Sequence, residues 1–366
     1  MSGIISLMVS GAIGVIIPII LDINNYSSYQ TYQLYISFVG LLHFGFINGV
    51  CLKYGNKDYD ELPFSIFRGY IRYLFLLQMV VLIIAFFILL FFVKTEEKTP
   101  FIFLFINSSL INISCYFSLI TQFTKRFIID GKIQIILSGL LLLLFSIIMT
   151  YKINNYEYYL CCITIVNITS LMLYLAPNIK TVVGRWELSF SDIIECHKRG
   201  VYINFSEIIG IVIVSIDSVF VNVLCDEEVF AIYTFSAGIV LLYYKFVNII
   251  SKLFFPYLKR VNKEELAASY TKLTERIQCI IFLMLSSIGL FGEIVNYLNH
   301  EYSESLMYVT ILLPTVVFKC LIDLLCNTIY KVMDLEKAFL RIICLLYVLL
   351  SLLTFLHGGC FKKHMQ

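Results

Sequence analysis

Residues 71–93 read IRYLFLLQMVVLIIAFFILLFFV, and this stretch decides the fold class. Apart from Arg72 it holds no charged residue, and as a helix it is long enough to cross a hydrocarbon core of roughly 30 Å. It is apolar on every face, whereas a strand of a membrane barrel alternates apolar and polar residues. The stretch therefore predicts a membrane-spanning helix.

Similar stretches recur along the whole chain. Of the 366 residues 60% are hydrophobic and 14% are charged, and the mean hydropathy is +0.87, which excludes a water-soluble protein. The net charge of +2 is small and the basic residues are scattered, so a nucleic-acid partner is not expected. The predicted fold class is an all-α, polytopic membrane helical bundle. We expect eleven spans, at residues 1–21, 33–52, 71–93, 101–122, 133–151, 157–177, 200–224, 229–252, 277–297, 305–330 and 339–357.

The loops between these spans alternate in charge. One set of loops holds twenty lysines and arginines, whereas the other set holds only Lys94, Lys98 and Lys152. By the positive-inside rule the basic set is cytoplasmic, which places the amino terminus in the cytoplasm. With eleven spans the basic tail Lys362–Gln366 would be external, against the rule, and this indicates a missing twelfth helix or a miscounted span.

The spans fall into two groups. Residues 178–199 are the least hydrophobic interruption in the first two thirds of the chain, with six spans before them and five after. We expect an N-terminal lobe at 1–177, a cytoplasmic linker at 178–199 and a shortened C-terminal lobe at 200–366. A faint repeat starting at Tyr35 and at Tyr233 passes from outside to inside both times, which predicts two lobes with a substrate path between them.

Ionisable side chains at membrane depth are costly, so each has a partner, faces water or marks a site. Glu207 and Lys245 lie at one depth on adjacent spans and can pair, either to hold the helices together or to contact substrate. Asp217 has no obvious basic partner at its depth. It suits an ion-coupling site, or else hydroxyls such as those of Ser215 or Ser218 cap it.

Lys319 and Asp323 lie four residues apart on one helix face. They can neutralise each other as a structural pair, or Lys319 can point into a hydrophilic cavity.

His43 and Asn48 are polar groups in the middle of the second span. For His43 a satisfied buried histidine is favoured over a ligand. Gly45 and Gly49 form a small-xxx-small pair that lets another helix backbone approach, so helix packing is the favoured interpretation for them.

Soluble-type catalytic motifs are absent. The sequence has no P-loop, GxGxxG, GxSxG, HExxH or CxxC pattern, so we expect neither an enzyme nor a bound cofactor or metal. The short external loops also disfavour a membrane glycosyltransferase or polymerase.

Two blocks resemble a known family. YQTYQLYISFVGLLHFGFINGVCLKYGNKDYDEL (29–62) and SEIIGIVIVSIDSVFVNVLCDEEVFAIYTFSAGIVLLYYKFVNIISKLFFPYLKRV (206–261) are similar to parts of Wzx-type O-antigen and polysaccharide flippases. These belong to the multidrug/oligosaccharidyl-lipid/polysaccharide (MOP) exporter superfamily. The resemblance runs from residue 1 to about residue 356, and Asp217 matches an acidic residue common in that family. The chain departs from the family in lacking a basic lead and a twelfth helix.

The resemblance implies a MATE-like pair of lobes around a central cavity in a bacterial cytoplasmic (inner) membrane. It implies alternating access that moves an undecaprenyl-diphosphate-linked oligosaccharide from the inner to the outer leaflet, beside polymerase and glycosyltransferase partners. The expected substrate-binding residues are Lys245, Lys319, His43 and Asn48, and the ion-coupling candidates are Asp217 and Glu207. The alternatives are a drug or metabolite antiporter of the same superfamily, a nontransporting scaffold and an inactive truncated paralogue.

Overall fold

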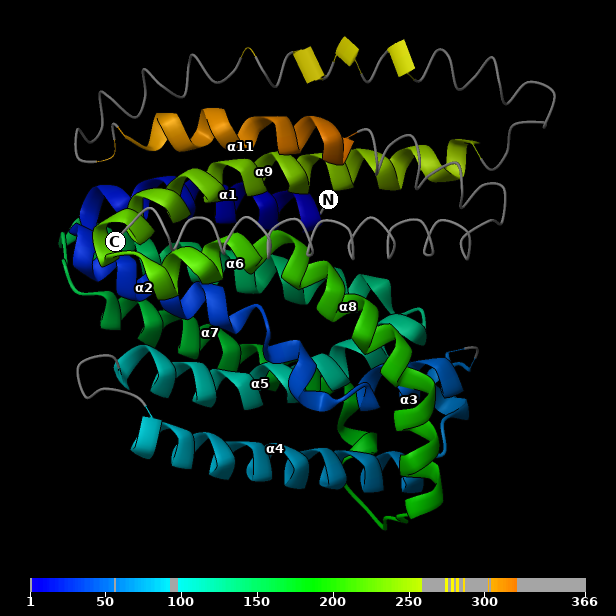
Figure 1. Cartoon of the computed structure of the whole chain (residues 1–366). Helices are drawn as coiled ribbons and strands as arrows, with labels where there is room; N and C mark the ends of the chain where they lie inside the picture. Colours follow the sequence, from blue (N-terminus) through cyan, green and yellow to red (C-terminus); the bar gives the residue numbers. More distant parts are fainter. Residues whose placement is uncertain are drawn as a thin grey trace, which may run out of the picture. The chain divides into compact units, whose positions relative to one another are not determined.

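The computed structural model describes residues 2–258 except 56 and 93–97, together with 274–275, 278–279, 281–282, 286, 302 and 304–320. Every regular element in these residues is helical (Figure 1). The chain divides into two compact units, Met1–Phe235 and Ser236–Gln366, and the boundary falls within a helix. The predicted all-helical class is therefore confirmed for the described residues.

The first unit contains most of the described helices. They are α1 (Ser2–Ile20), α2 (Ile23–Ile36), η1 (Val39–His43), α3 (Phe46–Tyr54), η2 (Tyr59–Glu61), α4 (Phe64–Phe92), α5 (Lys98–Phe123), α6 (Phe127–Thr150), α7 (Tyr156–Leu175), η4 (Ala176–Thr181), α8 (Phe190–Leu224) and the beginning of α9 (Glu227–Leu258).

Four described helices are long and apolar enough to cross a membrane: Phe64–Phe91, Lys98–Phe123, Phe127–Thr150 and Tyr156–Thr181. The bent pair Ile23–His43 and Phe46–Tyr54 makes a fifth if it is one span. These five coincide with the predicted spans at 71–93, 101–122, 133–151, 157–177 and 33–52. Ile5–Ile20, Ser215–Leu224 and Ser305–Phe318 are shorter apolar helices. The predicted span at 339–357 and nearly all of that at 277–297 lie outside the described residues, so the count of eleven stays a prediction.

Loops that the sequence places on the same side of the membrane contact one another. On the predicted outer side, Asn154 donates to the carboxylate of Asp22 (2.8 Å), which also caps α2 by accepting from the backbone of Asn25. On the predicted cytoplasmic side, Lys53 reaches Glu195 (2.8 Å). Both contacts are compatible with the predicted sides, and the orientation itself stays a prediction.

The core of the first unit lies where α3, α4, α5 and α8 meet. It is built from buried aromatic side chains, with Phe46 against Tyr70 at a centroid distance of 5.5 Å and Tyr116 against Phe117 at 5.4 Å. In contrast, α4 exposes a row of large apolar side chains from Phe75 to Phe91. An apolar face left open beside a well-packed core suits contact with lipid.

The segment predicted as a linker, residues 178–199, packs onto the first unit. The Arg68 guanidinium donates to the carbonyls of Lys180 (2.9 Å) and Arg185 (3.0 Å), and the Glu187 amide donates to Ser65 (3.0 Å). From Phe190 the segment is already helical, because the Ser189 side chain caps the beginning of α8. The second half of the predicted linker is therefore the first part of α8, and the lobes 1–177 and 200–366 stay a prediction.

The second unit is described for the remainder of α9 and for α11 (Ser305–Cys320). The two helices are joined where Ser236 Oγ donates to the Ser305 carbonyl (2.9 Å) and where Tyr244 Oη donates to Thr315 Oγ1 (2.6 Å). The predicted span at 305–330 begins in α11, and its second half lies outside the described residues.

Candidate functional site

The second apolar span is broken in its middle. After η1, Phe44 (φ 50°) and Gly45 (φ 77°) adopt left-handed backbone conformations, and the axis turns by 54° before α3 begins. A left-handed pair ends the regular hydrogen-bond ladder, so carbonyls near the break need other partners. The sequence predicts one continuous span at 33–52, and the structure corrects it to two pieces.

Polar side chains of α4 and α5 supply partners for these carbonyls. Gln78 Nε2 donates to the Leu42 carbonyl (3.1 Å), and Asn112 Nδ2 donates to the Val39 carbonyl (3.2 Å) and to Gln78 Oε1 (3.1 Å). Asn112 Oδ1 is buried without a partner among the described residues. A buried unmatched acceptor is costly, so this atom suits a water or a bound donor group.

His197 of α8 also contacts the break. Its Nδ1 lies 2.9 Å from the Phe44 carbonyl and its Nε2 lies 2.8 Å from the Tyr73 hydroxyl. Because a carbonyl oxygen only accepts, Nδ1 donates to Phe44, and in the tautomer protonated at Nδ1 the Nε2 atom accepts from Tyr73. His197 could not be singled out from the sequence, because its partners Phe44 and Tyr73 come from distant segments.

His43 lies at the break itself. Its side chain is 3% exposed, and Nδ1 accepts from the backbone amide of Gly45 (3.2 Å). This contact fits the favoured interpretation of a satisfied buried histidine. A substrate-binding role for His43 stays a prediction.

Asn48 and Glu207 are brought together from α3 and α8. Asn48 Nδ2 donates to Glu207 Oε2 (3.1 Å), and the Glu207 side chain is otherwise exposed. Lys245 lies on α9, with its side chain outside the described residues, so its pairing with Glu207 stays a prediction. The structure thus adds one partner for Glu207 that sequence spacing did not reveal.

Three glycines allow α3 and α8 to approach this closely. A Cβ at Gly49 would lie 1.8 Å from the Cys196 carbonyl oxygen, and one at Gly200 would lie 1.9 Å from the Gly45 carbonyl oxygen. Only a residue without a side chain fits at such contacts. The predicted packing role of Gly45 and Gly49 is therefore confirmed, with Cys196 to Gly200 as the backbone that approaches.

Asp217 is held by hydroxyl and amide donors. Tyr233 Oη donates to Oδ2 (2.6 Å), while the Ser218 backbone amide (2.7 Å) and hydroxyl (3.4 Å) donate to Oδ1. The hydroxyl cap expected from Ser218 is present, and Tyr233 is a partner that the sequence analysis missed. The ion-coupling role of Asp217 stays a prediction.

Lys319 belongs to the last turn of α11, but its side chain lies outside the described residues, as does all of Asp323. Neither the structural pair nor the binding role of Lys319 is tested.

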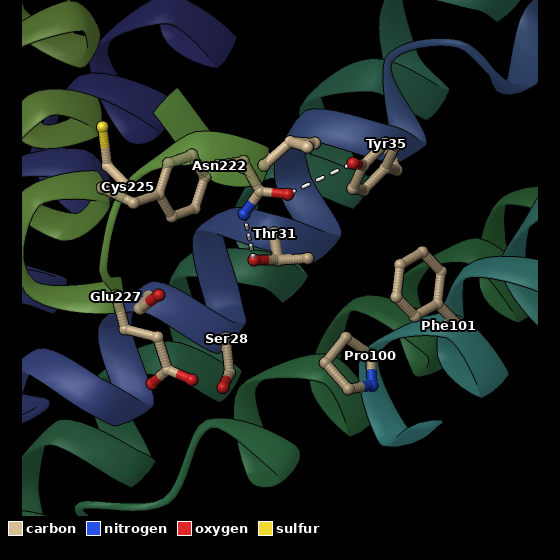
Figure 2. Close-up of a pocket in the computed structure, with 11 residues that line it drawn as sticks. Ser28, Thr31, Tyr35, Pro100, Phe101, Asn222, Cys225 and Glu227 are labelled. Carbon is tan, nitrogen blue, oxygen red and sulfur yellow. Dashed lines mark hydrogen bonds between the residues drawn. The ribbon is translucent and has the colours of Figure 1, made fainter. Parts of the chain in front are cut away.

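A pocket of about 420 Å³ opens at the predicted outer ends of α2, α5 and α8 (Figure 2). Asn222 projects between two α2 side chains, accepting from Tyr35 Oη (3.1 Å) and donating to Thr31 Oγ1 (3.1 Å). Among the described residues that line it none is basic, and Glu227 alone is acidic. The lining consists of Ser27, Ser28, Thr31, Tyr35, Pro100, Phe101, Asn222, Val223, Cys225, Glu227 and Phe230.

The sequence analysis missed this pocket because its walls come from three distant segments. One signal was available: the run SSYQTYQLY at 27–35 is rich in hydroxyl and amide groups although it adjoins an apolar span.

No protein-family model, curated protein or solved structure matches the chain. Within the described part of the chain, no group of three or more His, Cys, Asp or Glu residues could hold a metal ion.

Proposed function

We propose that the protein is a membrane transporter, and specifically a flippase for undecaprenyl-diphosphate-linked oligosaccharide. It works by alternating access between two lobes formed by about eleven helices. It resides in a bacterial cytoplasmic membrane with its amino terminus in the cytoplasm. The observation that carries the proposal is the apolar helix broken between His43 and Phe46, with polar side chains gathered around the break.

Breaking a helix inside a membrane is energetically unfavourable, because backbone groups at the break lose their helical hydrogen bonds. A span with a purely structural role has no need of such a break. Irregular backbone at membrane depth is tolerated where it is buried in protein or lines a cavity, and discontinuous helices form the substrate and ion sites of many transporters. Here Gln78 and Asn112 are both buried and bind the backbone beside the break, while the carboxylate of Glu207 lies next to α3. This arrangement supports transport over a scaffold role.

The pocket at the predicted outer end supports a polar, hydroxyl-rich cargo. Its hydroxyl and amide groups can exchange hydrogen bonds with sugar hydroxyls, and the rings of Tyr35 and Phe101, 5.5 Å apart, offer an apolar surface to a sugar face. The absence of a basic residue among its described lining residues separates this pocket from the diphosphate site, which we assign to Lys245 and Lys319. The flippase identity itself rests on the resemblance of residues 29–62 and 206–261.

A deletion strain of the host tests the proposal. The strain should accumulate lipid-linked oligosaccharide on the inner leaflet and lose surface polysaccharide, and the wild-type gene should restore both. A Glu207→Gln variant should restore less than a matched variant of an exposed lipid-facing residue, Ile84→Ala, at equal protein level. Unchanged polysaccharide with altered drug sensitivity would favour the antiporter, and no change in either would favour an inactive protein.

A further inference from the structure

Helix α8 is longer than a membrane crossing requires. Its 35 residues extend about 52 Å, against a hydrocarbon core of roughly 30 Å. The apolar part is its carboxyl end, Ser215–Leu224, whereas the first part carries acidic and basic residues. In Figure 1 this first part runs across the direction of α4 and α5.

One face of this first part packs against α3. Ile193 and Cys196 are buried there, and Lys53 Nζ binds Asp192 Oδ1 (3.3 Å) and Glu195 Oε2 (2.8 Å). The hydrogen bond from Lys53 lowers the pKa of Glu195. Arg199 also binds Glu195, so each of the two acidic side chains has a basic partner.

Another face carries exposed apolar side chains. Phe190 (72% exposed), Ile194, Val201 and Phe205 (61% exposed) follow one another at i, i+4, i+11 and i+15, which places them on one stripe of the helix. The second half of the stripe, Val201 and Phe205, already belongs to the part of α8 predicted to span the membrane, residues 200–224.

Trp186 and basic side chains border the stripe. Trp186 is 50% exposed, and the Arg72 guanidinium lies 5.0 Å from the centre of its ring. Arg185 and Lys198 are exposed nearby, with Glu187 as the exposed acidic residue of this loop. Tryptophan prefers the membrane interface, and lysine and arginine are attracted to anionic headgroups.

We infer that Trp186, Phe190 and Ile194 dock into the anionic cytoplasmic leaflet, so that the beginning of α8 lies along the membrane surface and the stripe enters the hydrocarbon at Val201 and Phe205. An amphipathic helix with an apolar face and adjacent basic side chains binds in this way. The lipid surface is favoured over a protein partner because the stripe joins a membrane span and the excess charge beside it is positive. The inference is independent of the cargo.

Trp186 is the only tryptophan of the chain and reports its own depth. The full-length protein is reconstituted in vesicles of phosphatidylcholine and phosphatidylglycerol with bromine either near the headgroup end or near the methyl end of the acyl chains. We expect Trp186 to lose most of its emission with shallow bromine and clearly less with deep bromine. If neither bromolipid quenches the emission of Trp186, the inference is wrong. This result is also expected if another protein surface, rather than lipid, covers the tryptophan.

A double variant in the stripe, Phe190→Asp with Ile194→Asp, separates docking from mere proximity. It should lose most of the shallow quenching, whereas Tyr151→Asp, the same type of change at an exposed residue on the opposite side, should not. Equal thermal unfolding of the stripe variant and wild type in detergent shows that the variant folds. Wild-type quenching in a folded stripe variant would refute the docking. If the double variant unfolds, the single variant Ile194→Ser is measured instead. It should lose a smaller part of the quenching by shallow bromine, and wild-type quenching would again refute the docking.

Discussion

The α-carbon of Gly49 faces the carbonyl oxygen of Cys196 so closely that a Cβ at position 49 would lie 1.8 Å from that oxygen. This contact joins α3, the second piece of the broken span, to the first part of α8. The same two helices carry Asn48 and Glu207, which are joined by a hydrogen bond, and Glu207 follows Phe205 of the exposed apolar stripe by two residues. The packing of the glycines and the geometry of the candidate site are therefore coupled.

Gly49→Ala should destabilise the protein by about 1–3 kcal/mol, because the added methyl group must push two backbones apart. Gly139→Ala is the control, since a Cβ there meets nothing within 4 Å and alanine favours the helix. Thermal unfolding in detergent measures both. Equal melting temperatures for the two variants would show that the α3 and α8 backbones are not in contact.

Tyr233→Phe should weaken the packing of α8 against the start of α9, because Asp217 Oδ2 loses a donor 2.6 Å away. Leaving a buried polar atom without its partner costs about 1–3 kcal/mol. Unfolding of this variant is compared with that of Tyr158→Phe, at an exposed tyrosine of α7. If Asp217 also couples ions, the pH profile of transport shifts in the Tyr233 variant only; a change in stability without such a shift assigns Asp217 a structural role.

Features that depend on consecutive residues could be predicted from the sequence, whereas features that depend on contacts between distant segments could not. Span positions follow from apolar length, and the spacing of Gly45 and Gly49 predicted close helix packing, because both are properties of consecutive residues. The break at Phe44 was missed, since apolar composition continues through it and the partners Gln78 and Asn112 come from other helices. The early start of α8 was readable: Ser189 precedes Asp192 by three residues, which is typical of a helix cap.

Cys225 offers a direct test of topology. It is exposed beside the pocket and lies in a predicted external loop, so a variant that retains only this cysteine should react with a membrane-impermeant maleimide in whole cells. A cysteine introduced at Asn25 should also react, whereas cysteines introduced at Asn56 or Lys263 should react only after the membrane is opened. Labelling at position 263 from outside would refute the orientation.

Glu207 and Lys245 are expected to interact. Glu207→Lys or Lys245→Glu alone should impair folding or transport by placing like charges together, while the double reversal should recover part of the loss. Asn48 Nδ2 donates to Glu207, and with lysine at position 207 the amide must turn so that Oδ1 accepts instead, so the recovery is expected to be incomplete. A double variant no better than the worse single variant would show that the two residues do not pair.

Lys319 is expected to bind the diphosphate of the lipid carrier. A diphosphate in a region of low dielectric constant needs a compensating positive charge, and Lys319 lies near the middle of its predicted span. On this reasoning Lys319→Gln leaves expression and thermal stability nearly intact, abolishes flipping, and is not rescued by Asp323→Asn. Arginine at position 319 should retain some activity because it keeps the charge while changing its geometry.

If Lys319 only neutralises Asp323, Lys319→Gln instead destabilises the protein and the added Asp323→Asn restores it. Surface polysaccharide and protein level, measured together in the wild type and these variants, distinguish the two outcomes, and normal polysaccharide in the Lys319→Gln strain would exclude the headgroup role.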